Sequence, residues 1–156
     1  MLLVEGFLLS LTGVLLMLLF EFGLSMGDVK KIRSSDGGKL YTEGMIASIF
    51  NYLVFGPITY YLTMIVCLDD DDHSRSIGQQ VYSVIAFLVI QSGLFFCIHY
   101  TMHTRPFYWM HRFHHRFNSI VLPSSASAVS PAEFIVAYML PFVIAAKLGS
   151  CDKPSA

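Results

Sequence analysis

The sequence predicts an all-α integral membrane protein with three spanning helices, a short fourth half-span or re-entrant helix, and a cytosolic, histidine-rich helix at the membrane interface. Three observations lead to this fold class. The 156-residue chain is 54% hydrophobic and only 13% charged, a balance typical of membrane proteins. Long uncharged stretches alternate with polar loops along the chain. Five histidines follow directly after the third of these stretches.

The first three uncharged stretches are the candidate spans. They run from Gly6 to Phe20, with an extension past Glu21 to Met26, from Met45 to Leu68, and from Ser76 to Ile98. The second and third exceed the roughly 20 apolar residues that a spanning helix needs. Glu5 stands where a secretory signal would carry positive charge, so we expect a retained anchor in place of a cleaved leader. Gly56-Pro57 should kink the second span.

A fourth apolar segment runs from Phe134 to Ala146 and contains Pro141. At 1.5 Å per residue it would reach only about 20 Å, against a hydrocarbon core of about 30 Å. We therefore expect a half-span or re-entrant helix here.

Basic residues are unevenly shared among the loops. Four (Lys30, Lys31, Arg33 and Lys39) lie between the first and second stretches, one (Arg75) lies between the second and third, and three follow the third. The positive-inside rule then puts the first loop in the cytosol, together with the segment that contains five histidines (residues 99–117, the histidine segment). The expected organisation is an N-terminal membrane anchor over residues 1–80, a histidine-containing domain over 81–149, and a short polar tail over 150–156.

The five histidines lie within seventeen residues and form the candidate site. They are His99, His103, His111, His114 and His115. Residues three and four apart share one helix face, so each group can aim its imidazoles at a common point. Imidazole is the commonest side-chain metal ligand, and histidine at membrane depth is rare without a function. The cluster predicts a metal site, and all-nitrogen ligands leave zinc, copper, iron and nickel open.

The residues from Phe107 to Phe117 mix aromatic side chains with Arg and His. This mixture is typical of a helix that lies in the membrane interface, where Tyr108 and Trp109 would anchor it. His99 and His103 should extend the third span toward the same interface, so that a bound metal would face lipid chains from the side.

Other polar features have simpler interpretations. His73 lies at the opposite end of the third span, about 35 Å away at 1.5 Å per residue, so we exclude it from the site. The acidic run Asp69–Asp72 is interpreted as a solvated loop. Cys67, Cys97 and Cys151 show no paired spacing and imply no disulfide framework. A net charge of -1 with scattered basic residues argues against nucleic acid as a partner.

Together these residues resemble the fatty acid hydroxylase and sterol desaturase superfamily of integral membrane oxygenases. The matching segments are His99-x-x-x-His103, Tyr108-Trp109-Met110 leading into His111-x-x-His114-His115, and Ser130-Pro131-Ala132-Glu133. The resemblance covers about Phe95 to Pro141. Membrane acyl-lipid desaturases have similar histidine boxes, but theirs are some tens of residues apart, so the short gap here favours the hydroxylase and sterol desaturase side.

The resemblance implies a non-haem di-iron centre whose ligands would be the five clustered histidines. It further implies O2 as oxidant, with electrons from NAD(P)H delivered by a b-type cytochrome or a reductase. The expected reaction is hydroxylation or desaturation of a sterol or fatty acyl lipid in the endoplasmic reticulum, with the histidines facing the cytosol. Expected partners are the membrane lipid substrate and the electron-donor protein.

The chain departs from the family pattern at two points. Tyr100 follows the first histidine where the family often has Arg. The family also has a third histidine box after the next membrane hairpin, whereas this chain ends at Ala156, so residues 81–149 are expected to be a partial domain from a truncated gene model, a splice form or a degenerate copy. A second hypothesis is therefore a non-catalytic remnant or metal-binding partner protein, which could form a homo-oligomer. A histidine-lined metal transporter is a weaker third, because its ligands should lie near the membrane midplane.

Overall fold

The computed structural model describes residues 1–33, 37–67, 76–118 and 122–150. Every secondary-structure element within these ranges is a helix, so the predicted all-helical fold is confirmed. The acidic run Asp69–Asp72, His73, Cys151 and the tail after residue 150 lie outside the described residues.

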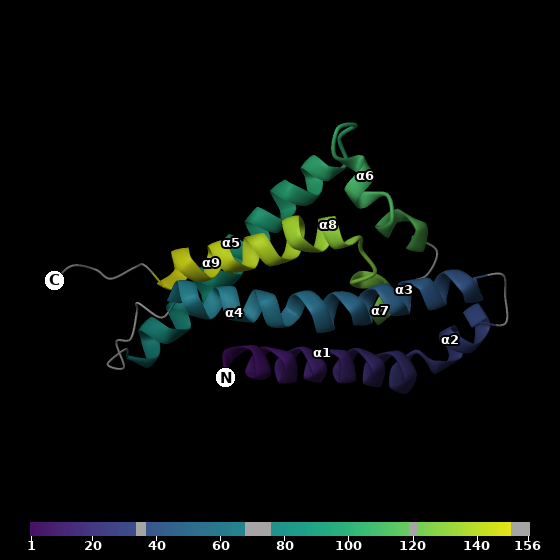
Figure 1. Cartoon of the computed structure of the whole chain (residues 1–156), viewed down its shortest axis with the longest axis horizontal. Coiled ribbons are helices and arrows are strands. Elements are labelled where there is room, and N and C mark those ends of the chain that lie inside the picture. The colour runs from purple at the N-terminus through teal and green to yellow at the C-terminus, as the bar shows by residue number, and fades with distance from the viewer. Residues whose placement is uncertain (34–36, 68–75, 119–121, 151–156) are drawn as a thin grey trace.

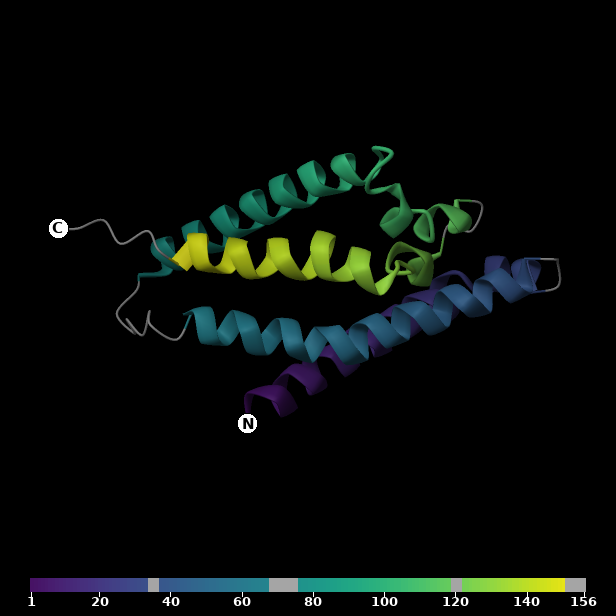
Figure 2. The same cartoon turned by 45° about the horizontal axis from the view of Figure 1, so that its top comes forward.

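Four helical runs form the body of the protein, and shorter elements connect them. The elements are α1 (Leu2–Leu24), α2 (Met26–Arg33), α3 (Gly38–Phe50), η1 (Asn51–Phe55), α4 (Gly56–Cys67), α5 (Ile77–Met102), α6 (Tyr108–His111), η3 (His114–Phe117), α7 (Pro123–Ala126), α8 (Pro131–Glu133), η4 (Phe134–Met139) and α9 (Leu140–Ser150). The runs are α1, α3 through α4, α5, and α8 through α9. They alternate in direction along the chain, and across the molecule they lie in the order α1, α4, α9, α5 (Figures 1 and 2).

The alternation places the histidine segment at the same end of the molecule as α2 and the start of α3 (Figure 1). α2, at that end, contains basic residues of the first loop. The two basic regions that the charge count assigns to one side of the membrane therefore lie at one end of the molecule. The other end holds the N-terminus, the end of α4, the start of α5 and the end of α9 (Figure 2).

Among the described residues, four helical runs are long and apolar enough to cross a membrane: Leu2–Gly23, Gly38–Cys67, Ile77–Met102 and Pro131–Gly149. Their outer faces expose large apolar side chains, such as Leu19, Val89 and Phe96. The three predicted spans are confirmed as long apolar helices.

The expected half-length of the fourth helix is wrong. It begins at Pro131, and its 19 residues to Gly149 reach about 28 Å at 1.5 Å per residue. Ser130 starts it, because the Ser130 hydroxyl accepts a hydrogen bond from the Glu133 backbone N–H and proline is suited to the first helical position. The predicted segment starts at Phe134, after the charged Glu133. In the structure the Glu133 side chain is buried and lies within the helix.

Both internal prolines of these runs follow a π-helical segment. η1 ends at Phe55, two residues before Pro57, and η4 ends at Met139, two residues before Pro141. Proline lacks an N–H and its ring clashes with the carbonyl of the residue four positions earlier. A wider π turn relieves that clash by shifting the carbonyls, so each helix continues past its proline.

Small residues allow α1 and α4 to pack closely. A Cβ atom on Gly6 would lie 3.0 Å from the Pro57 Cα atom, and one on Gly56 would collide with the Ser10 hydroxyl. The Ser10 hydroxyl is itself satisfied, because it donates to the Gly6 carbonyl. Close backbone approach through small residues is the usual means of association for membrane helices, where apolar burial supplies little drive.

Polar side chains from the first two runs hold the short helix α7 and the non-helical residues that join it to α8. Glu21 accepts hydrogen bonds from the Ser124 backbone N–H (2.9 Å) and from the Ser124 hydroxyl (2.8 Å). The Asn51 amide donates to the carbonyls of Ser127 (3.2 Å) and Val129 (3.0 Å). Backbone outside a helix has few partners in an apolar setting. These side chains supply the missing partners and fix the segment that leads into Ser130.

Candidate metal centre

The five predicted histidines converge from three elements at the end of α5. His99 lies in the last turn of α5 and His103 caps its C-terminus, His111 ends α6, and η3 carries His114 and His115. Ring centroids are 4.4 Å apart for His99 and His111, 4.9 Å for His103 and His115, and 5.4 Å for His111 and His114. The structure thus brings the five rings together, while their role as metal ligands stays a prediction.

The segment that carries three of these rings differs from the single interfacial helix predicted for Phe107 to Phe117. It consists of one α-helical turn, α6, and one 3-10 turn, η3. A segment this short gains little from helix propagation, and its contacts with other elements determine its path. Tyr108 and Trp109 are exposed, as expected of interfacial anchors.

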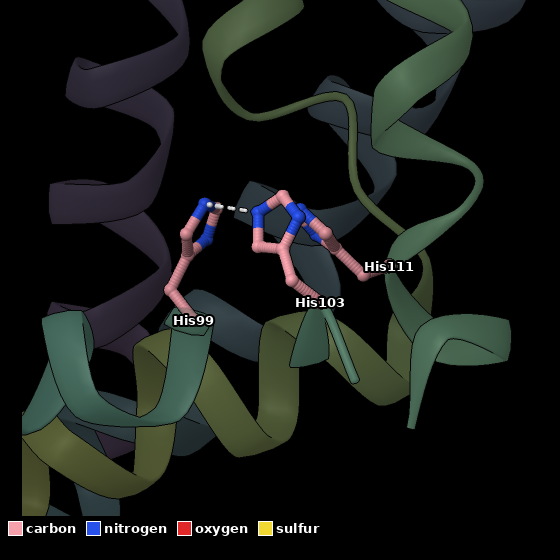
Figure 3. A group of neighbouring side chains, drawn as sticks. All are labelled: His99, His103 and His111. Atoms are coloured by element: carbon pink, nitrogen blue, oxygen red, sulfur yellow. Dashed lines mark hydrogen bonds between the residues drawn. The ribbon is translucent and has the colours of Figure 1, made fainter. Parts of the chain in front are cut away.

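His99, His103 and His111 have the mutual spacing that the ligands of one metal ion require (Figure 3). One potential ligand atom from each of the three lies within 4.8 Å of the others. The Nε2 atoms of His99 and His103 are 3.4 Å apart, and two nitrogens at roughly 2.1 Å from one tetrahedral metal would also be separated by about 3.4 Å. The donor set and its spacing therefore fit a metal ion of the kind that imidazole favours.

Glu133 orients His111. The Nδ1 atom of His111 lies 2.6 Å from the Glu133 Oε1 atom, and both side chains are 0% exposed. When Glu133 is a carboxylate it accepts the proton of His111 Nδ1, and this arrangement leaves the lone pair on Nε2. That Nε2 atom is buried and has no hydrogen-bond partner among the described residues. A carboxylate behind a histidine with a free second nitrogen is the usual arrangement of a metal-bound histidine.

Three of the other four rings also present a buried nitrogen without a hydrogen-bond partner in the described ranges: His99 Nδ1, His114 Nδ1 and His115 Nε2. The opposite nitrogen of His115, Nδ1, lies 3.3 Å from the Asn118 side-chain amide. Buried polar atoms are nearly always satisfied in native proteins. Several unsatisfied ring nitrogens in one cluster therefore require further partners, which a metal ion or ordered water can supply.

The cluster favours neutral imidazoles. Burial and, to a smaller extent, repulsion from charge on His99, His115, His103 and His114 together lower the pKa of His111 to about 3. Burial also lowers the pKa of His114, while a hydrogen bond with the Ala128 backbone opposes that change. At neutral pH both rings are therefore uncharged, which is the form that binds a metal.

Two contacts secure the histidine segment from outside the cluster. The Ser130 hydroxyl donates to the Met110 carbonyl (2.6 Å), which links the start of α8 to the residue before His111. Arg116 forms an ion pair with Glu43 (2.7 Å) and so joins the segment to α3. The segment is thus attached on both sides of His111.

Sequence reasoning missed Glu133, Asn118 and Glu43 as residues of the site. Glu133 carried a usable signal, because Ser130-Pro131-Ala132-Glu133 has the Ser-x-x-Glu spacing of a helix start and places a carboxylate beside an apolar segment. Asn118 and Glu43 carried none, since their roles depend on contacts with the folded histidine segment.

Comparisons with protein-family models, with curated proteins and with solved structures return no match. The family resemblance thus depends on the histidine spacing and the segments around it.

Proposed function

We propose that this protein is a membrane-bound metalloenzyme of the histidine-box type, which oxidises a lipid with O2. The observation that carries the proposal is the convergence, at one end of the four helical runs, of five imidazoles, four of which have a buried ring nitrogen without a hydrogen-bond partner among the described residues. His99, His103 and His111 would hold one ion, and His114 and His115 would contribute two further ligands to a di-iron centre whose ligand set these five residues supply only in part. When bound, iron supplies the oxidising power to break an unactivated C–H bond of a sterol or fatty acyl chain, which leaves a hydroxyl group or a double bond.

The chain's own residues would act on the site in simple ways. Glu133 holds the proton on His111 Nδ1 and so keeps the Nε2 lone pair directed at the cluster. The Ser130 bond to the Met110 carbonyl keeps α6 against α8. The location at the end of α5 would bring the ligands to the level of lipid headgroups, where a chain can approach from the side.

The cellular setting follows from the same proposal. The basic first loop shares an end of the molecule with the histidines, which supports a cytosolic orientation under the positive-inside rule. We propose the endoplasmic reticulum as the membrane and a cytosolic b-type cytochrome or reductase, fed by NAD(P)H, as the electron donor.

The metal content of the purified full chain tests the first half of this proposal. After expression with added iron, elemental mass spectrometry should find about one or more iron ions per chain, since three imidazoles suffice to hold one ion. His111→Ala should reduce the bound iron to background. His73→Ala is the matched control, because His73 precedes α5 in the sequence, and it should retain full metal content. Equal metal in wild type and His111→Ala would contradict the site.

Lipid oxidation tests the second half. Membranes supplied with NAD(P)H and isotopically labelled O2 should yield a lipid with one added oxygen, or with two hydrogens fewer, only when His111 is intact.

A second candidate function, non-catalytic metal binding, is favoured by the fact that only three of the histidines meet the mutual spacing of one ion among the described residues. Iron binding without any O2-dependent product would support that candidate over the enzyme.

A further inference from the structure

A separate apolar cavity lies between α3, the outer face of the histidine segment and the start of α8. Its volume is about 840 Å³, within the roughly 300–1,000 Å³ of small-molecule sites. Ile46, Ala47 and Phe50 line it from α3, and Trp109 and Phe113 line it from the histidine segment. The lining is thus almost entirely hydrocarbon and aromatic.

The cavity is distinct from the candidate metal centre. Among the described residues, none of the five histidines lines it. Trp109 and Phe113 alternate with His111 and His114 along the segment, so the aromatic side chains face the cavity while the imidazoles face the cluster. The inference therefore goes beyond the proposed function and does not depend on it.

Arg112, one of the residues that line the cavity, forms no ion pair within the described residues. Two charged residues line the cavity, Glu43 and Arg112. Glu43 is already paired with Arg116, whereas Arg112 forms no ion pair with any carboxylate of the described chain. Because Arg116 neutralises Glu43, the Arg112 guanidinium is the charge that remains beside the apolar lining.

The location of the cavity indicates which molecule can enter it. Its α3 wall belongs to the candidate span Gly38–Cys67 and lies toward the histidine end of that span. Ile46 and Phe50 are exposed on the outer face of the same span, where lipid chains are the surrounding solvent. Trp109, 59% exposed, has the amphipathic ring that prefers the headgroup level.

We propose that this cavity binds one chain of an anionic phospholipid, with the lipid phosphate on the Arg112 guanidinium. A guanidinium matches a phosphate with paired N–H donors, and the apolar walls match the acyl chain. A bound lipid of this kind would press on the outer face of the histidine segment and stabilise its folded path.

The single tryptophan of the chain, Trp109, is a built-in reporter. The full chain is reconstituted in phosphatidylcholine vesicles that contain phosphatidylglycerol, with brominated acyl chains on only one of the two lipids at a time. Bromine quenches tryptophan fluorescence at contact. Brominated phosphatidylglycerol should reach half-maximal quenching at a mole fraction about fivefold lower than brominated phosphatidylcholine, the preference that one basic residue near a membrane surface confers.

Two variants with matched controls test where the preference arises. Arg112→Gln should bring the two lipids to equal quenching, whereas Arg105→Gln, which removes an exposed charge from the same segment outside the cavity lining, should keep the preference. Ala47→Phe should fill the cavity and weaken quenching by both lipids, whereas Ile85→Phe on the exposed face of α5 should not.

Three results would overturn the proposal. Equal quenching by the two lipids in the wild-type chain would remove the headgroup preference. An equal loss in Arg105→Gln and Arg112→Gln would reduce it to general attraction to a charged surface. Unchanged quenching in Ala47→Phe would place the contact on the outer helix surface. Metal content is measured separately, so none of these outcomes is confused with failure of the metal site.

Discussion

Two buried glutamates, Glu21 on α1 and Glu133 on α8, occupy apolar helical runs and differ in how they are satisfied. Each is 0% exposed. Both carboxylate oxygens of Glu21 accept a hydrogen bond from Ser124. Glu133 uses one oxygen for His111, while its Oε2 atom has no partner among the described residues.

The difference separates a structural role from a role in the site. A carboxylate with a hydrogen bond to each oxygen from one neighbouring residue connects two parts of the fold. Glu133 instead contacts a side chain that still has a free nitrogen, and both belong to a cluster with several unsatisfied atoms. Both glutamates are buried. The number of polar atoms around each that lack a hydrogen bond distinguishes the two places.

The largest expected effect is on stability and comes from Glu21→Ala. This change leaves the Ser124 N–H and hydroxyl without acceptors in a buried position, and hydrogen bonds to charged groups contribute about 1.5–3 kcal/mol each. We expect a loss of about 3 kcal/mol or more in the free energy of unfolding, measured by denaturant titration in detergent micelles. Metal affinity of the fraction that remains folded should change little. A stable variant with weakened metal binding would reverse the assigned roles.

The next effect is on metal affinity and comes from Glu133→Ala. Loss of the acceptor behind a metal-bound histidine typically costs 10- to 100-fold in affinity, which is about 1.4–2.7 kcal/mol. Competition with a chromophoric chelator measures it. Glu133→Gln is the matched control, because its amide oxygen can still accept from His111 Nδ1, and it should lose less affinity. If the Ala and Gln variants bind metal equally well, Glu133 does not position His111.

The smallest effect is expected at a third carboxylate, Glu43, which is 34% exposed and paired with the 50% exposed Arg116. Ion pairs at such positions contribute about 0–1 kcal/mol, because water and salt screen them. Glu43→Gln should therefore lower the free energy of unfolding by less than about 1 kcal/mol, and the difference should shrink at high salt. A loss as large as that of Glu21→Ala would mean that the attachment of the histidine segment to α3 is itself a main determinant of the fold.

Most of the fold could be predicted because membrane helices satisfy their own backbone groups, so a long apolar stretch alone specifies a helix. The predicted fourth helix is too short because Glu133 interrupts the apolar sequence and so marks an apparent helix end. Only its contact with His111, which the sequence does not show, explains why this charged residue lies inside the helix. The turns of the histidine segment also differed from prediction, because contacts of Ser130 and Arg116 determine its path.

The sequence by itself determined the helical class, the spans and the five histidines, because apolar length and i, i+3 and i, i+4 spacing are local properties. Only the tertiary structure decided which residues support the site. Glu133 meets His111 across 22 positions and Glu21 meets Ser124 across 103, and no local pattern records such distant partners. The physical reason is that a buried polar group must find its partner wherever the packed helices bring one within reach.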